Sequence, residues 1–127
     1  MMELPHVSAR KALEALERRQ FFEKGEVKAF YFTFSEIMRR YLESIRHFPA
    51  AEYTTEEISH QIRMEIDRKL LPLLRQADLV KFADTVPTPA RKEEDVRSAL
   101  SYIDKTRPPS IDAANVEPQR RIVGGKP

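Results

Sequence analysis

One stretch of the chain decides the fold: residues 26–46 read EVKAFYFTFSEIMRRYLESIR. Its apolar side chains recur every three or four positions, which is the repeat of an amphipathic α-helix. We therefore predict a long helix here, and we expect its broad apolar face to lie in the core. That face comprises Phe30, Phe34, Ile37, Met38, Tyr41, Leu42 and Ile45.

The other side of this helix is charged. Glu36 precedes Arg40 by four residues, and Arg39 precedes Glu43 by four. Ion pairs at this spacing stabilise a helix by about 0.2–0.5 kcal/mol each. The pattern therefore predicts a face that is turned to the solvent.

Phe32 projects close to this charged side, away from the apolar face. Two interpretations stay open. Either the first helix covers its ring, through Phe21 or Phe22, or the ring is a contact for a partner protein. The first interpretation predicts a buried side chain and the second an exposed one.

Helix boundaries elsewhere follow from capping residues. Ser8 can cap a first helix, and Gly25 can end it, because glycine readily takes the left-handed conformation of a helix C-terminus. Thr54 and Glu57 have the spacing of a capping box, in which each residue binds the backbone N–H of the other. This box predicts the start of a third helix.

Prolines mark the starts of the last two helices. Pro72 cannot lie deep inside a helix, because it lacks the backbone N–H and its ring clashes, so we expect a break near residues 68–71 and Pro72 in the first turn of a fourth helix. Pro89, with Thr88 as cap, suits the start of a fifth helix. The fourth helix is apolar on two sides, so we expect neighbours to bury both and the helix to pack centrally. Those sides comprise Leu73, Ala77 and Val80, and Leu79 and Phe82.

A chain of 127 residues is long enough for one domain with a single core. We expect a flexible N-terminus at residues 1–7, an all-α bundle of about five helices at residues 8–106, and a disordered tail at residues 107–127. In the tail, apolar residues are too sparse to offset the ordering of the backbone. No apolar run approaches the roughly 20 residues needed to span a bilayer.

Charge and cysteine content narrow the function. Lys and Arg number 22 against 20 Asp and Glu, and a net charge of +2 is too small to indicate nucleic-acid binding by field strength alone. There are no cysteines, which excludes disulfides and thiolate metal sites. Arginine pairs such as Arg39 and Arg40 are of a kind that contacts phosphate or acidic lipid, but alternating charge is usually a solvated helix face.

No arrangement of nucleophile, base or metal ligands appears in the sequence. Glu57 and His60 have the spacing of half a di-iron site, but no second such pair accompanies them. Asp78 and Lys81 are three residues apart on an otherwise apolar helix, which could mark an acid and a base. We favour a local ion pair, or a contact between Asp78 and an arginine of the second helix such as Arg39 or Arg40. We therefore expect no enzymatic activity, no metal and no cofactor.

Four segments together resemble the cytoplasmic C-terminal domain of a family of bacterial single-pass membrane proteins of unknown biochemical activity. They are residues 40–43 (RYLE), 54–57 (TTEE), 77–83 (ADLVKFA) and 102–106 (YIDKT). One departure is that residues 44–49 lack the family's usual glycine at that turn. Genes of the family typically lie beside those for MoxR-type AAA+ ATPases and Bat-type von Willebrand A proteins. The positions that carry the resemblance include Tyr41, Thr54, Glu57, Asp78, Lys81 and Phe82.

The resemblance implies a non-catalytic protein-binding domain in envelope maintenance or metalloenzyme assembly. It implies a place on the cytoplasmic face of the inner membrane, behind an anchor that would precede residue 1. The partner would be a MoxR-type ATPase or a von Willebrand A protein, with no small-molecule substrate. The alternative is a soluble helical regulator that binds nucleic acid or acidic surfaces through its arginine pairs. Since the apolar stripes are needed for the core, we expect a partner to contact Phe32, Arg39, Arg40 and Arg46.

Overall fold

The computed structural model describes residues 3–108. Within that range the chain forms five α-helices and two short 3-10 helices, and no strand. The predicted all-α bundle is thereby confirmed, whereas the predicted disordered tail lies outside the described residues from residue 109 onward. The elements are α1 (Pro5–Arg18), α2 (Val27–Arg46), η1 (Ala50–Glu52), α3 (Thr55–Gln61), η2 (Glu65–Leu70), α4 (Leu71–Phe82) and α5 (Pro89–Thr106).

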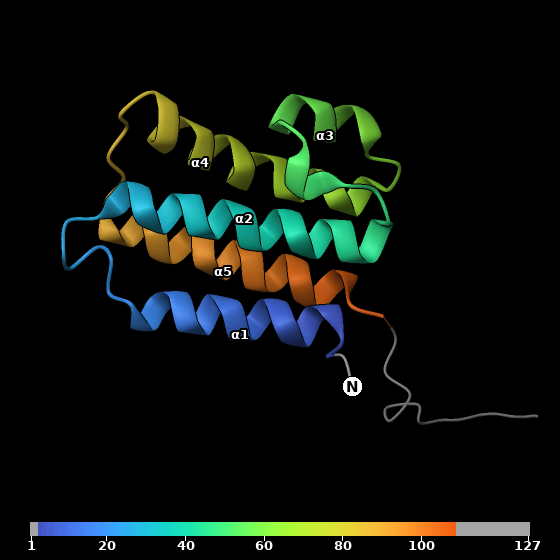
Figure 1. The fold of residues 1–127 in the computed structure, drawn as a ribbon, viewed down its shortest axis with the longest axis horizontal. Helices are drawn as coiled ribbons and strands as arrows, with labels where there is room; N and C mark the ends of the chain where they lie inside the picture. The colour runs from blue at the N-terminus through green and yellow to red at the C-terminus, as the bar shows by residue number, and fades with distance from the viewer. Residues whose placement is uncertain (1–2, 109–127) are drawn as a thin grey trace, which may run out of the picture.

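The helix α2 lies at the centre of the bundle. It packs against both α1 and α4, while α5 packs against α1, α4 and η2. Figure 1 shows α1, α2, α4 and α5 roughly side by side, with the short helix α3 next to α4. Because α2 has neighbours on several sides, its wide apolar face meets most of the core.

The predicted helix at residues 26–46 is confirmed as α2. At its C-terminus, His47 takes a left-handed conformation with φ of 63°, and its N–H donates to the carbonyl of Glu43 at 2.9 Å. A histidine thus forms the left-handed cap in a turn where the resembled family has a glycine, at a strain of about 1 kcal/mol. The fully or nearly fully buried members of the predicted apolar face are Phe30, Phe34, Met38, Tyr41 and Leu42.

The helix α1 begins earlier than predicted. Its first residue is Pro5, and Leu4 rather than Ser8 precedes the helix. Proline suits this place because the first helical N–H has no partner within the helix. The predicted flexible N-terminus is therefore helical from Pro5 onward. The helix also ends earlier than predicted, at Arg18 rather than at Gly25. Turns lead from there to Gly25, which has a left-handed φ of +74° but does not cap the helix.

The capping box predicted at the start of α3 is present. The N–H of Glu57 donates to Oγ1 of Thr54 at 3.1 Å, and the N–H of Thr54 donates to Oε1 of Glu57 at 2.8 Å. The break predicted just before Pro72 lies earlier, at Ile62 and Met64, which are both extended. Then η2 runs directly into α4, with Pro72 in the first turn as predicted. No break is needed beside this proline, since in the first turn its missing N–H has no intrahelical partner to lose.

The helix α4 is buried on one side only. Leu74, Ala77 and Val80 are fully buried, whereas Leu79 is 49% and Phe82 is 75% exposed. The prediction that neighbours bury both sides and that α4 packs centrally was therefore wrong. The reason is that α4 lies on the outer side of α2, where the short helix α3 covers part of its length (Figure 1).

Two buried carboxylates attach α5 to the rest of the bundle. Asp67 of η2 accepts hydrogen bonds from Nε of Arg46 at 2.7 Å and from the hydroxyl of Tyr102 at 2.8 Å. Asp95 of α5 accepts one from the hydroxyl of Tyr31 at 2.6 Å. Buried carboxylates require such partners, so these contacts specify where α5 packs.

Candidate functional site

Phe32 lies on the surface of α2 and is 52% exposed. The interpretation in which the first helix and its following turn cover the ring is therefore wrong. Phe22 packs against Phe30 instead, with ring centroids 5.4 Å apart. The ring of Phe32 lies beside Lys81 of α4, whose Nζ is 5.0 Å from the ring centroid.

Phe82 is the second aromatic neighbour of this ammonium group. The Nζ atom of Lys81 lies 5.4 Å from the ring centroid of Phe82. Aromatic faces attract cations through the quadrupole of the ring. Lys81 thus contacts both exposed rings, that of Phe82 on α4 and that of Phe32 on α2.

A groove lies next to these rings, between α2, α4 and the segment that joins η1 to α3. Its volume is about 370 Å³. Since Phe82 and Lys81 belong to its lining, the groove continues the surface that the two rings form. The lining residues are Arg39, Ala51, Glu52, Tyr53, Thr54, Thr55, Asp78, Lys81 and Phe82.

Arg39 connects α2 to the segment on the far side of the groove. Its guanidinium donates to the carbonyl of Tyr53 and, at 3.1 Å, to Oγ1 of Thr55. Only 13% of its side chain is exposed, and its Nε is buried without a hydrogen-bond partner among the described residues. Glu43, four residues on, accepts instead from the backbone N–H of Ala51 at 3.0 Å.

Asp78 is shared by three elements. Its Oδ2 accepts a hydrogen bond from Oγ1 of Thr55 at 2.6 Å. Its Oδ1 lies 3.8 Å from Nζ of Lys81 and 4.0 Å from Nη2 of Arg39. Both contacts favoured from the sequence, the local ion pair and the arginine of α2, are therefore present. Asp78 links α2, α3 and α4 around the groove.

Lys81 is a nearly buried cation. Only 10% of its side chain is exposed. Burial lowers the pKa of Lys81, the neighbouring charge of Arg39 lowers it further, and Asp78 compensates only in part. The charged form of Lys81 is therefore less favoured at this place than in water.

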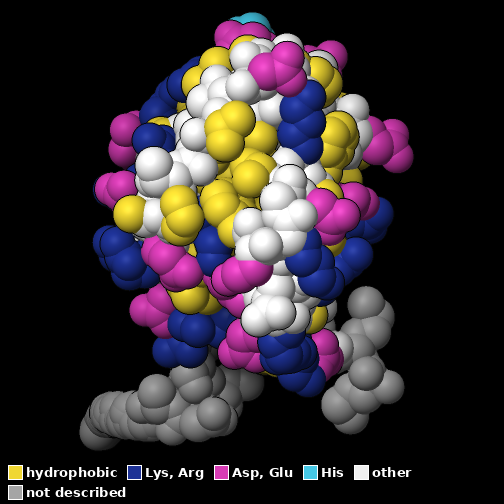
Figure 2. Space-filling view, turned by 90° about the vertical axis from the view of Figure 1, so that its left-hand side faces the viewer, with side chains coloured by type: hydrophobic (Ala, Val, Ile, Leu, Met, Phe, Trp, Pro, Cys, Tyr) yellow, Lys and Arg dark blue, Asp and Glu magenta, His cyan; other side chains and the backbone are white. Residues whose placement is uncertain are grey.

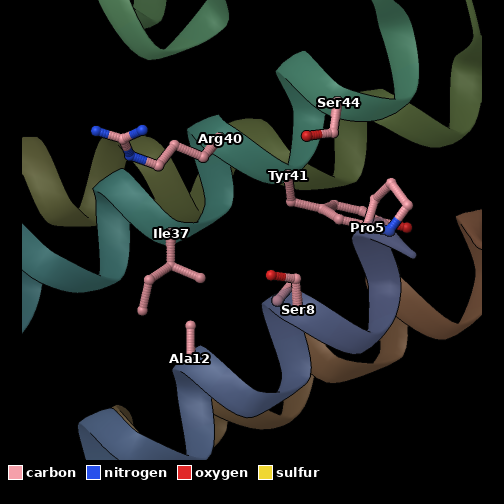
Figure 3. Close-up of a pocket in the computed structure, with 8 residues that line it drawn as sticks. Pro5, Ser8, Ala12, Ile37, Arg40, Tyr41 and Ser44 are labelled. Atoms are coloured by element: carbon pink, nitrogen blue, oxygen red, sulfur yellow. The ribbon is translucent and has the colours of Figure 1, made fainter. Parts of the chain in front are cut away.

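The other two predicted contact residues lie elsewhere. Arg46 is hydrogen-bonded to the buried carboxylate of η2. Arg40 is exposed and pairs with the glutamate four residues before it, at 2.7 Å. Figure 3 shows Arg40 at a separate pocket of about 140 Å³ between α1 and α2, with its guanidinium directed away from Ser8. The structure thus brings Phe32 and Arg39 to the groove region and leaves Arg40 and Arg46 apart from it.

Of the six residues on which the family resemblance rests, Tyr41 and Glu57 do not line the groove. The hydroxyl of Tyr41 is 2.7 Å from Oγ1 of Thr106, which attaches the end of α5 to α2. Burial raises the pKa of Tyr41. Thr54 and Glu57 form the capping box of α3. Thr54 also lines the groove, as do Asp78, Lys81 and Phe82.

Exposed apolar side chains gather at the end of the bundle where the α1–α2 and α4–α5 connections lie. Of the six large hydrophobic residues exposed within residues 3–108, Leu4 and Met64 lie elsewhere. Figure 2 looks onto this end and shows hydrophobic side chains gathered between basic and acidic ones. Of the other four, Phe32 was singled out from the sequence, Leu79 and Phe82 were expected to be buried, and Val86 was not predicted to matter. We call these four the exposed apolar face: Phe32, Leu79, Phe82 and Val86.

Metal-binding and membrane-spanning features are absent from residues 3–108. Glu57 and His60 are both exposed. In this range, no group of three or more His, Asp or Glu side chains could hold a metal ion. Nor is any of its helices both long and apolar enough to cross a lipid bilayer.

Comparison with known proteins did not identify a relative of this chain. No family model, curated protein or solved structure gives a significant match to this chain. The function is therefore argued from the groove and the exposed apolar face, and the family resemblance stays a prediction.

Proposed function

We propose that this chain is a non-catalytic protein-interaction domain, which binds its partner through the exposed apolar face and the adjoining groove. The observation that carries the proposal is the exposure of Phe82, at 75%, and of Phe32, at 52%, beside one lysine. Gathered apolar side chains with a polar rim are typical of interaction sites.

The two aromatic side chains of the exposed apolar face, Phe32 and Phe82, are of a kind enriched at protein interfaces. An aromatic side chain buries about 150–250 Å² when it is fully covered. Removing a hot-spot aromatic weakens binding by about 2 kcal/mol or more. Lys81 also stabilises the positions of Phe32 and Phe82, by about 0.5–1 kcal/mol for each cation–π contact at an exposed site. Rings that are ordered before binding lose less entropy when the partner arrives.

The lining of the groove favours binding over catalysis. It includes no cysteine, histidine or serine. A lysine with a lowered pKa is a better nucleophile than usual, but the carboxylate nearest to Lys81, that of Asp78, already accepts the hydroxyl of Thr55. The polar groups of the groove therefore serve its structure and its charge.

The alternative, a regulator that binds nucleic acid, requires a basic surface. Figure 2 shows basic and acidic side chains interspersed on the side that carries the exposed apolar face. Arg39 and Arg46 are both hydrogen-bonded to partners inside the protein. Both observations favour a protein partner.

The resemblance seen in the sequence supplies the class of partner. We propose a MoxR-type AAA+ ATPase or a Bat-type von Willebrand A protein, met at the cytoplasmic face of the inner membrane. Because a regulated ATPase must release its partners, a contact of moderate affinity centred on a few aromatic side chains is suitable.

Biolayer interferometry with the purified domain and these two proteins of the same organism tests the proposal. Phe82→Ser and Phe32→Ala should each weaken binding by about tenfold or more. Both should leave the melting temperature nearly unchanged, because both side chains are exposed. Met64→Ser is the matched control, since Met64 is 49% exposed but lies between α3 and η2.

Binding that survives both phenylalanine changes would place the interface elsewhere on the bundle. A clearly lower melting temperature for Phe32→Ala would show that this ring belongs to the fold. Absence of binding to either protein would contradict the class of partner.

A further inference from the structure

The N–H donors of Lys81 are a feature of the groove that the proposed function does not yet use. Building on that function, we propose that the groove binds an acidic side chain of the partner, with its carboxylate on the ammonium group of Lys81 and its apolar neighbours on Phe32 and Phe82. The ligand is thus a peptide segment in which an acidic residue is flanked by apolar ones.

Within the described residues, the N–H donors of Lys81 form no hydrogen bond. An ammonium group carries three N–H donors. Among residues 3–108, its partner carboxylate oxygen is Oδ1 of Asp78 at 3.8 Å, which is beyond hydrogen-bonding distance, and its other close neighbours are two aromatic rings. Although only 10% of the side chain is exposed, Lys81 lines the groove, so a ligand there can reach the ammonium group. Since charged donors are costly to bury without acceptors, an acceptor supplied by a ligand is favoured here.

Two cations and one carboxylate lie close together at Lys81. Arg39 is nearly as buried, and its Nε has no partner within the described part of the chain. The carboxylate between the two cations, that of Asp78, accepts a hydrogen bond from Thr55 and lies 4.0 Å from Arg39. Two cations therefore share one carboxylate, and among residues 3–108 neither is paired with Glu52, the second carboxylate of the groove lining. A ligand carboxylate would supply Lys81 with an acceptor.

A carboxylate suits this site better than a phosphate does. A phosphate brings about 1.5–2 negative charges at neutral pH. Glu52 also lines the groove and would repel the additional charge. A carboxylate brings one charge and accepts charge-assisted hydrogen bonds from an ammonium group. The neighbouring rings of Phe32 and Phe82 supply contacts for apolar side chains on either side of the acidic one.

Three tetrapeptides test the inference by NMR titration of the isotope-labelled protein. Acetyl-Leu-Glu-Leu-Glu-amide carries side-chain carboxylates, and acetyl-Leu-Gln-Leu-Gln-amide carries none. Acetyl-Leu-Gln-Leu-Gln with a free C-terminus carries only a main-chain carboxylate. We expect the first peptide to shift the amide signals of Thr55, Lys81 and Phe82 and to bind about tenfold more tightly than the second.

Lys81→Met removes the charge and keeps an apolar side chain of similar length, so it should abolish the preference for the acidic peptide. Lys105→Met removes an exposed lysine of α5 and should keep that preference. Thermal melts show whether both variants fold. The comparison of the three peptides on the unaltered protein needs no variant, so it decides the question on its own.

Equal affinity for the Glu and Gln peptides, signal shifts outside the groove, or an unchanged preference in Lys81→Met would overturn the inference. Tightest binding of the peptide with the free C-terminus would overturn the assignment to a side chain. A protein partner that is lost with Phe82→Ser but kept with Lys81→Met would leave the proposed function standing and refute this inference. A partner that ignores both changes would contradict both.

Discussion

The buried carboxylate of Asp67 tests how the bundle is held together. It lies on η2 and accepts two hydrogen bonds from Arg46 of α2, at 2.7 and 3.0 Å, and one from Tyr102 of α5, at 2.8 Å. Asp67 is only 2% exposed. Because these bonds join three elements at one residue, we expect Asp67→Asn to destabilise the whole bundle.

The magnitude follows from what asparagine keeps and what it loses. It keeps the shape of aspartate but not the charge, so Arg46 loses a charged acceptor. Hydrogen bonds to charged groups contribute about 1.5–3 kcal/mol each, and removing one partner of a buried ion pair costs about 3–5 kcal/mol. The side chain of Arg46 is 24% exposed, so water can solvate part of the guanidinium. We therefore expect the free energy of unfolding to fall by about 2–4 kcal/mol.

Removing the guanidinium of Arg46 should lower the free energy of unfolding more than Asp67→Asn does. Arg46→Met leaves the carboxylate of Asp67 with the hydroxyl of Tyr102 as its remaining partner, at a place that water hardly reaches. The expected loss is about 3–5 kcal/mol. The double variant Arg46→Met, Asp67→Asn leaves no unpaired charge, so its loss should be smaller than the sum of the two single losses.

Urea unfolding followed by far-ultraviolet circular dichroism measures these free energies, since the signal reports the helices directly. A loss below about 0.5 kcal/mol for Asp67→Asn would refute the role given to this carboxylate, because that value is typical of a surface substitution. Strictly additive effects would show that Arg46 and Asp67 are not coupled.

Three other outcomes are expected. Phe82→Ala should change the free energy of unfolding by less than about 0.5 kcal/mol, whereas Leu74→Ala should lower it by about 2–5 kcal/mol, because only Leu74 is buried. Parallel urea titrations compare the two variants, and equal losses would contradict the placement of α4. Thr54→Ala removes one hydrogen bond of the capping box and should cost about 1 kcal/mol in the same assay, with faster hydrogen exchange in the first turn of α3. Burial and the hydrogen bond to Asp67 raise the pKa of Tyr102 above the ordinary value of 10.0, so the unfolded chain releases this proton first. That contribution to stability is fully present below pH 10.0 and is lost as the pH rises through the folded-state pKa, so Tyr102→Phe should flatten the fall in stability measured above pH 10.0, and an unchanged slope would contradict the assignment.

Local signals in the sequence predicted most of the helix starts. The hydroxyl of Thr88 accepts from the N–H of Arg91 at 3.1 Å, and Pro89 follows it in the first turn of α5, both as predicted. The capping box of α3 was predicted in the same way. Each of these rules acts within about four residues, so a short window of sequence contains all of its physics.

Contacts between distant segments could not be predicted in this way. Asp67 is 21 residues from Arg46 and 35 residues from Tyr102 along the chain. Helical periodicity shows that each helix has an apolar side, but it does not show which helices meet or in which register. The three residues on which α5 depends therefore gave no joint signal.

The candidate site was predicted in part, for the same reason. Phe32 was singled out as a ring on a charged face, and Asp78 with Lys81 as two charges on an apolar helix. The structure brings Asp78 and Lys81 into one groove and Phe32 beside it, because α2 packs against α4. No local pattern in the sequence links the two helices. The available signal was a single lysine within residues 79–83 (LVKFA), since a lone charge in an apolar run has either a partner or a function.

The helix α4 is apolar on two sides, yet the bundle buries one of them. The other side leaves Leu79 and Phe82 exposed, where a polar residue would change the stability of the isolated chain by less than about 0.5 kcal/mol. Folding alone therefore gives no reason for apolar residues at these positions. Covering these two side chains stabilises a complex by about 25 cal/mol for each Å² of apolar surface removed from water. A second neighbour packed along α4 would provide this stabilisation. Under the proposed function that neighbour is the partner protein, and the two-sided pattern, wrong for the isolated domain, describes α4 in the complex.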